Sequence, residues 1–210
     1  MNAQTQHFTL TGSAGLIECK LDLPQDIAPR GIAIVAHPHP LYGGTMDNKV
    51  VQTLVRAFLA LGYACARMNF RGVGKSEGVH DAGNGETDDL ALLYEYMIER
   101  YPGLPVALSG FSFGTFVQSH LQQRLALQGR PAERLVLVGC AAGKWELAPV
   151  PADTLLIHGE QDDTIPLSDV LDWARPQDLP VIVIPGADHF FHRKLHHIKQ
   201  WVVAMWNQEP

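Results

Sequence analysis

Short, nearly continuous apolar runs recur along the chain after residue 30. They cover residues 31–36, 64–69, 106–108, 135–138, 154–157 and 181–184. Such runs are typical of strands that are buried on both faces of a parallel sheet. An earlier pair, residues 8–10 and 16–23, brackets a Gly-Ser-Ala-Gly turn, and residues 16–23 alternate between apolar and polar positions. This pair predicts an antiparallel hairpin with one exposed face.

Helical periodicity fills the intervals between these runs. Apolar residues at Leu90, Leu93, Tyr94 and Met97 share one helical face,. Alternating strands and helices predict an α/β fold, a three-layer sandwich with a mostly parallel central sheet and helices on both faces. No repeat or linker interrupts the pattern, so we expect a single domain over residues 1–210. The expected helices cover residues 48–61, 86–101, 113–128, 168–174 and 194–206.

Composition narrows the classes of function. Hydrophobic residues make up 46% of the chain and charged residues 18%, which excludes intrinsic disorder,. The net charge of -6 argues against nucleic acid as a partner,. No apolar run has the length of a membrane helix, and the first residues lack the pattern of a signal peptide,. Three distant cysteines indicate neither a disulfide framework nor a thiolate metal site, so we expect a cytoplasmic protein without membrane contact,.

A GxSxG pentapeptide follows the predicted strand 106–108 directly. It reads Gly110-Phe111-Ser112-Phe113-Gly114, and the predicted helix 113–128 starts within it. In this setting the motif predicts a sharp turn that holds Ser112 in a strained backbone conformation, with small flanking residues that allow close packing. Its hydroxyl would then be exposed at a helix N-terminus as a candidate nucleophile.

A serine nucleophile needs a histidine base and a carboxylate that orients the base. The strand 154–157 leads into a loop with Asp162 and Asp163, and the strand 181–184 leads into a loop with His189. Both loops leave the carboxyl edge of the sheet, where the Ser112 turn also lies. The order serine, acid, histidine along the chain is the order found in α/β-hydrolases.

At these residues the sequence resembles the α/β-hydrolase superfamily, and within it a group of small bacterial hydrolases without a lid. The resemblance covers about residues 31–206 and includes two strings, His-Pro-His-Pro-Leu-Tyr-Gly-Gly from residue 37 and Asn-Phe-Arg-Gly-Val-Gly-Lys-Ser-Glu-Gly from residue 69. It implies Ser112 as nucleophile, His189 as base and Asp162 as acid in a Gly-x-x-Asp pattern. Asp163 stays open as an alternative acid.

The tetrahedral intermediate needs two backbone N–H donors, which form the oxyanion hole. Phe113 supplies one at the start of the helix. The second comes from the loop after strand 31–36, where Pro38 and Pro40 have no N–H,. We expect His39 as the donor, with Leu41 as the alternative if the register shifts by two.

The resemblance implies a carboxylesterase-like serine hydrolase that cleaves small esters through an acyl-enzyme and uses no cofactor. The alternatives are a thioesterase, peptidase or lyase with the same triad, or a ligand-binding protein that retains the fold without catalysis. Residues 139–153 are too few for a lid, so we expect an open site,. His192 and His196 lie one helical turn apart but lack a carboxylate partner, which favours a solvated helix face over a metal site,.

Other conspicuous residues have structural interpretations. His37 and His158 lie at strand ends, where we expect them to brace loops. Arg71 either binds a substrate carboxylate or, as we expect, ties its loop to neighbouring backbone. Trp145 either lines the pocket or packs on the helix after Ser112.

Overall fold

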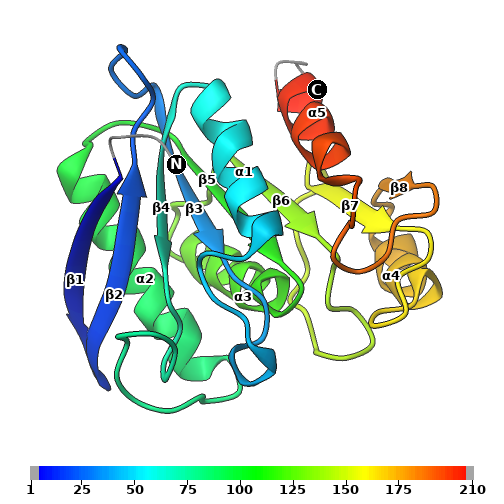
Figure 1. Cartoon of the computed structure of the whole chain (residues 1–210), viewed down its shortest axis with the longest axis horizontal. Helices are drawn as coiled ribbons and strands as arrows, with labels where there is room; N and C mark the ends of the chain where they lie inside the picture. Colours follow the sequence, from blue (N-terminus) through cyan, green and yellow to red (C-terminus); the bar gives the residue numbers. More distant parts are fainter. Residues whose placement is uncertain (1–4, 207–210) are drawn as a thin grey trace.

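One eight-stranded sheet organises the computed structural model, which describes residues 5–206 (Figure 1). The strand order is β1-β2-β4-β3-β5-β6-β7-β8. β1 and β2 form the antiparallel hairpin, β2 is antiparallel to β4, and all pairs from β4 across to β8 are parallel. The strands are β1 (Gln6–Gly12), β2 (Gly15–Asp22), β3 (Gly31–Ala36), β4 (Tyr63–Met68), β5 (Val106–Phe111), β6 (Arg134–Val138), β7 (Leu155–Gly159) and β8 (Val181–Ile184).

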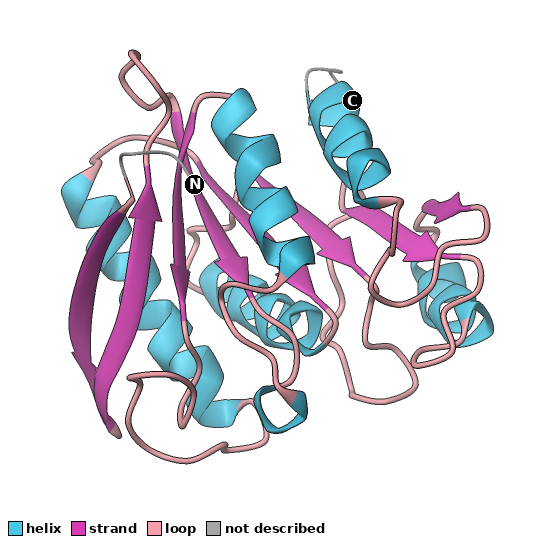
Figure 2. Cartoon of the chain, viewed as in Figure 1, coloured by secondary structure: helices cyan, strands magenta, loops and turns pink. Residues whose placement is uncertain are grey.

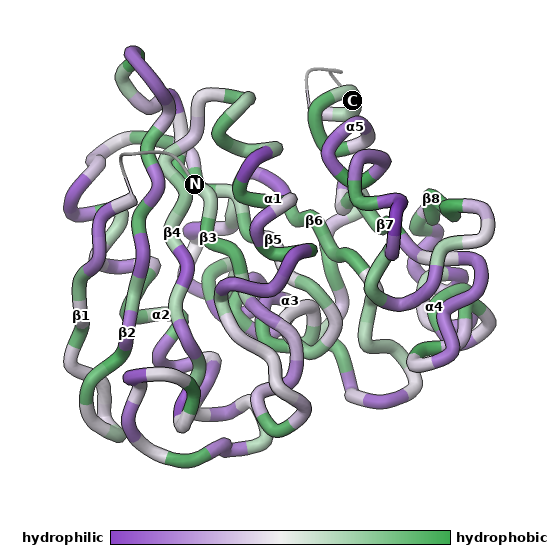
Figure 3. Tube along the Cα trace, viewed as in Figure 1, coloured by the Kyte–Doolittle hydropathy of each residue, from purple (hydrophilic) through white to green (hydrophobic). Residues whose placement is uncertain are grey.

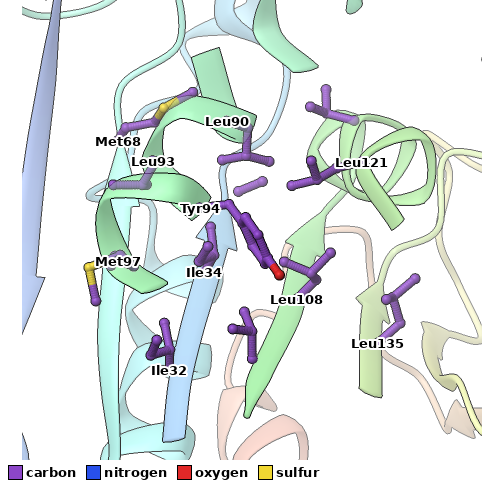
Figure 4. Close-up of a cluster of buried hydrophobic side chains, with 14 of the residues drawn as sticks. Ile32, Ile34, Met68, Leu90, Leu93, Tyr94, Met97, Leu108, Leu121 and Leu135 are labelled. Atoms are coloured by element: carbon purple, nitrogen blue, oxygen red, sulfur yellow. The ribbon is translucent and has the colours of Figure 1, made fainter. Parts of the chain in front are cut away.

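Helices cover both faces of the sheet (Figure 2). In β3, Ile32 and Ile34 pack into the core beneath α2 and α3, whereas Ala33 and Val35 pack against α1 and α5. Figure 4 shows Ile32 and Ile34 of β3 in one cluster with Leu90 and Met97 of α2. The helices are α1 (Lys49–Ala60), α2 (Asn84–Arg100), α3 (Phe113–Leu127), α4 (Leu167–Ala174) and α5 (Leu195–Trp206), with short 3-10 helices η1 (Pro40–Tyr42) and η2 (Arg175–Gln177).

The predicted fold class is confirmed, with a mostly parallel sheet between two layers of helices. Figure 3 shows that the inner strands are mostly hydrophobic, as the apolar runs of the sequence require,. β5 extends to Phe111, beyond the predicted end at residue 108. The reason is that Ser109 is buried and its hydroxyl donates to Val136 O at 3.1 Å, so a polar residue continues the strand. The single domain over residues 1–210 stays a prediction, and residues 1–4 and 207–210 lie outside the described part.

The described residues contain neither a membrane-spanning helix nor a lid between β6 and β7. No helix between residues 5 and 206 is long and apolar enough to cross a membrane. Residues 139–154, between β6 and β7, contain neither helix nor strand, so the structure has no lid at this position. Cys19, Cys65 and Cys140 are buried free thiols.

His37 joins two of the loops at the carboxyl edge of the sheet. It follows β3 directly and is fully buried. Its Nε2 accepts a hydrogen bond from Phe70 N–H at 2.9 Å, and its Nδ1 donates to Pro38 O at 2.6 Å. Burial lowers the pKa of His37 to about 4, so the ring is neutral in the folded protein. His37 therefore braces a loop, as its position at a strand end predicts.

The depressed pKa of His37 makes folding stability pH-dependent. An unfolded histidine binds a proton below about pH 6.5, whereas folded His37 resists protonation down to about pH 4,. Acid therefore favours the unfolded state in this interval, and the contribution of His37 should fall by about 2 kcal/mol between pH 7 and pH 4.5.

The measurement is urea unfolding across this pH range for the wild type and for His37→Gln, which keeps an acceptor for Phe70 N–H but does not titrate. The variant should lack the extra loss of stability in acid, whereas His7→Gln, which replaces an exposed histidine, should retain it. Parallel curves for wild type and His37→Gln would contradict the prediction.

Candidate active site

The turn between β5 and α3 holds Ser112 at φ 54° and ψ -122°, which is a strained conformation for a residue with a side chain,. Ser112 N–H donates to Val138 O at 3.0 Å, which ties the turn to the end of β6. The flanking glycines permit close packing. A Cβ on Gly110 would lie 2.4 Å from Gly114 O, and one on Gly114 would lie 2.5 Å from Ala36 O. The predicted geometry of the GxSxG turn is thus present.

The structure brings Ser112, His189 and Asp162 into one chain of contacts. Ser112 Oγ lies 3.0 Å from His189 Nε2, and His189 Nδ1 lies 2.7 Å from Asp162 Oδ2. All three residues are buried. The histidine can therefore accept the serine proton at Nε2 while its Nδ1–H is held by the carboxylate.

The loops that carry the acid and the histidine are bonded to each other. Gln161 N–H donates to Ala187 O at 2.9 Å, and Gly186 N–H donates to Glu160 Oε2 at 2.7 Å. These bonds join the loop after β7 to the loop after β8. The distance between carboxylate and imidazole is therefore set by backbone contacts as well as by their own hydrogen bond.

The Asp162 carboxylate is ionised in its buried position. Burial by itself raises its pKa, but the hydrogen bonds from His189 and from Ile165 N–H outweigh burial and hold the pKa below its usual value,. Oδ1 accepts from Ile165 N–H at 2.7 Å and from Thr164 N–H at 3.0 Å. Oδ2 is thereby left to face the imidazole.

The neighbouring carboxylates point elsewhere. Asp163 is exposed and contacts Thr164 Oγ1 at 3.4 Å. Asp188, directly before the histidine in sequence, pairs with His192 Nδ1 at 2.6 Å. Between Asp162 and Asp163, only Asp162 reaches His189.

The backbone N–H groups of Phe113 and His39, predicted as oxyanion-hole donors, have no acceptor among the described residues. Phe113 is the first residue of α3. Leu41 N–H instead donates to His39 Nδ1 at 3.2 Å. Of the two alternatives, the free N–H group therefore belongs to His39.

A cavity of about 400 Å³ opens beside Ser112. Its aromatic wall is closely packed, because the Phe113 ring lies 4.8 Å from the His39 ring and 4.9 Å from Trp145. The lining residues are His39, Tyr42, Ser112, Phe113, Ala141, Lys144, Trp145, Thr164 and Ile165.

Two residues with open interpretations are placed by these contacts. Trp145 both lines the cavity and packs on the helix after Ser112, since its ring lies 5.1 Å from Phe116 of α3. Arg71 ties its loop to the fold, but through side chains instead of backbone. Its Nε donates to Asp89 Oδ2 at 2.6 Å, and its Nη2 donates to Ser13 Oγ. This use of the guanidinium leaves it outside the cavity lining.

A second histidine-carboxylate pair supports the aromatic wall and was missed by the sequence analysis. The His80 ring lies 4.7 Å from the His39 ring, and its Nδ1 contacts Glu86 Oε1 at 2.9 Å. Glu86 is fully buried and also accepts from Gly83 N–H. The available signal was weak, because a glutamate three residues inside a helix start is a common capping residue.

The described residues include no group of three or more His, Cys, Asp or Glu side chains that could hold a metal ion. His196 packs against His197, with ring centroids 4.0 Å apart. His192 lies in the turn before α5 and pairs with Asp188 Oδ2 at 2.6 Å, so it has a carboxylate partner, contrary to the expectation from the sequence. His196 lies within α5.

Known proteins share the sequence pattern and the fold of this chain. A family model described as serine aminopeptidase S33 matches residues 28–157. A lidless α/β serine hydrolase from Xanthomonas campestris is 34% identical, with a TM-score of 0.89 and coverage of 100% of this chain and 99% of that one. An α/β serine hydrolase homologue from Coxiella burnetii is 32% identical, with a TM-score of 0.84 and coverage of 97% of both chains.

A sequence relative is similar over most of its length. An uncharacterized protein of Rickettsia prowazekii is 34% identical over 178 residues, which are 78% of this chain and 73% of the relative. The resemblance inferred from the sequence motifs is therefore confirmed. The chain belongs to the α/β-hydrolase superfamily, in the family that the serine aminopeptidase S33 model describes.

Proposed function

We propose that the protein is a serine esterase that cleaves small esters through an acyl-enzyme on Ser112. The observation that carries the proposal is the contact chain from Asp162 through His189 to Ser112, with distances of 2.7 and 3.0 Å, beside an open cavity. A base within hydrogen-bond reach of a nucleophile, itself oriented by a carboxylate, is the arrangement that nucleophilic catalysis requires.

In the acylation step, His189 Nε2 takes the proton of the Ser112 hydroxyl as Oγ attacks the ester carbonyl carbon. The carbonyl oxygen gains negative charge and accepts hydrogen bonds from Phe113 N–H and His39 N–H. The C–O bond to the alcohol then breaks, and His189 gives its proton to the leaving alkoxide. Asp162 stabilises the transient imidazolium and keeps Nδ1 protonated.

Deacylation repeats the same proton path. A water molecule gives a proton to His189 Nε2 and attacks the acyl carbon, and the same two N–H groups hold the oxyanion. The bond to Ser112 Oγ breaks, the serine recovers its proton, and the carboxylic acid leaves. Each step uses residues of this chain alone.

The cavity lining favours esters over the substrates of an aminopeptidase. An aminopeptidase must hold a cationic amino terminus, for which a carboxylate is the natural partner. The residues that line the cavity include the cation Lys144 and no Asp or Glu. A neutral ester avoids this unfavourable charge contact. Thioesters and amides with the same triad are the remaining rivals, as is an idle site that only binds a ligand.

Labelling by a fluorophosphonate probe tests whether Ser112 is activated. The wild type should be labelled and should hydrolyse esters faster than the matched thioesters or amides, whereas Ser112→Ala should be unlabelled and slower by roughly 10⁴-fold or more. Adding His189→Ala to that variant should cost little further, because the triad acts as a unit. Multiplying losses, or labelling that survives in Ser112→Ala, would refute the proposal.

Replacing each of the two adjacent carboxylates tests the acid. Asp162→Asn should lower the ester hydrolysis rate by roughly 10⁴-fold, because an amide stabilises the wrong imidazole tautomer. Asp163→Asn removes the same charge one residue away and should stay close to wild type, since that side chain is exposed. Steady-state kinetics on both variants, with urea unfolding to verify the fold, decides between them. Exchanged phenotypes would assign the acid to Asp163.

The acyl-chain preference follows from the cavity size and the missing lid. Each buried CH₂ contributes roughly 0.8 kcal/mol, but only while the cavity covers it. The value of kcat/KM for p-nitrophenyl esters should therefore peak at short acyl chains and decline from octanoate to laurate. A maximum at laurate, or a jump in rate when micelles form, would indicate a deep acyl tunnel or interfacial activation.

A further inference from the structure

His158 is a fully buried histidine next to the proposed triad that the proposed mechanism does not use. It occupies the fourth position of β7, opposite Val183 of β8. The neighbouring residues Leu156 and Ile157 pack into the cores on opposite faces of the sheet. His158 is thus a polar side chain at a strand position that otherwise takes apolar residues.

The contacts of His158 converge on the loop that carries the acid. Its Nε2 lies 2.9 Å from Ile165 O and 3.4 Å from Asp162 Oδ2. Ile165 in turn donates its N–H to Asp162 Oδ1 at 2.7 Å. One imidazole nitrogen therefore faces both oxygens, so Nε2 carries the proton. Residue Ile165 connects that donor to the carboxylate, because its C=O accepts from His158 and its N–H donates to Asp162,.

The other ring nitrogen has no partner. His158 Nδ1 is buried and finds no hydrogen bond anywhere in residues 5–206. Burial also lowers the pKa of His158, so the ring is neutral with an uncompensated lone pair at Nδ1,. A methionine or leucine would fill this space without that cost. A buried polar atom left unpaired calls for an explanation beyond packing.

We propose that His158 is a positioning residue that holds the acid loop so that Asp162 stays directed at His189. This assignment rests on the proposed function for its kinetic consequences. The Nε2–H of His158 donates to Ile165 O. This bond keeps the Ile165 N–H on Asp162 Oδ1, so that Asp162 Oδ2 is left for the catalytic histidine. The same nitrogen lies 3.4 Å from Asp162 Oδ2, and its N–H contributes to stabilising the charge of the carboxylate.

Three substitutions separate the hydrogen-bond donor from the bulk of the ring. His158→Met retains apolar bulk of similar length and removes the donor. His158→Gln places an amide N–H near the position of Nε2, whereas His158→Asn places its amide near Nδ1, too short to reach Ile165 O. The matched control is His120→Met, because His120 Nε2 makes a contact of the same 2.9 Å to Glu146 O outside the cavity lining.

The kinetic arm measures ester hydrolysis per folded enzyme. His158→Met and His158→Asn should lower kcat roughly tenfold, the rate equivalent of one net hydrogen bond, with KM within about twofold. His158→Gln should recover most of the loss, and His120→Met should match wild type. Equal losses of kcat in all three His158 variants would indicate that the ring contributes by packing alone. A change confined to KM would indicate a role through the cavity wall. Wild-type kinetics in His158→Met would indicate that His158 has no role in catalysis. Each of these results overturns the proposal.

The second arm needs no turnover and separates this proposal from the proposed function. The proton between His189 Nδ1 and Asp162 Oδ2 should give a low-field signal in the proton NMR spectrum. We expect that signal to shift or broaden in His158→Met and His158→Asn and to persist in His158→Gln, in His120→Met and in Ser112→Ala. An unchanged signal in His158→Met would overturn the positioning role even in a protein that hydrolyses no ester.

Discussion

The backbone conformation of Ser112 is the constraint on which the rest of the site depends. A positive φ at a residue with a side chain costs about 1 to 3 kcal/mol and persists only where the surroundings enforce it. Here the Ser112 N–H is bonded to Val138 O, and the Thr115 hydroxyl donates to Ser112 O at 2.6 Å. Gly110 and Gly114 allow the strand, the helix and the end of β3 to approach closely. The strain at one residue thereby presents a hydroxyl and an adjacent N–H to the same small volume.

Parallel strand order then brings the partners of Ser112 to that volume. Because β3, β5, β6, β7 and β8 run in one direction, the loops that follow them all leave the same edge of the sheet. The acid loop and the histidine loop are further joined by backbone hydrogen bonds, including Gln161 N–H to Ala187 O. Residues far apart in the sequence are therefore held to hydrogen-bond distances by a rigid sheet and not by long flexible side chains.

Polar groups beneath the site are buried at a cost that their mutual contacts offset. His37 and Asp162 each have partners for their polar atoms, and the environment keeps the first neutral and the second ionised. Glu86 is buried below the aromatic wall with several donors around it. His158 departs from this pattern at Nδ1. The carboxyl edge of the sheet thus carries several buried polar groups, most of them with partners, beside the apolar cores on the two faces,.

The sequence alone determined the fold class and the position of nearly every strand and helix, because these follow from local periodicity. It also placed Ser112 and His189 after their strands, because motifs within a few residues mark both positions. The Gly-x-x-Asp resemblance favoured Asp162 as the acid but left Asp163 open, because the two neighbouring side chains have the same chemistry and differ only in direction. The tertiary structure decided between them, since direction depends on backbone contacts with the next loop. The tertiary structure also pairs the Leu41 N–H with His39 Nδ1 and leaves the His39 N–H free. In addition, it brings His80 from a distant segment against the His39 ring. These outcomes depend on packing between elements, which no pattern within a single segment encodes.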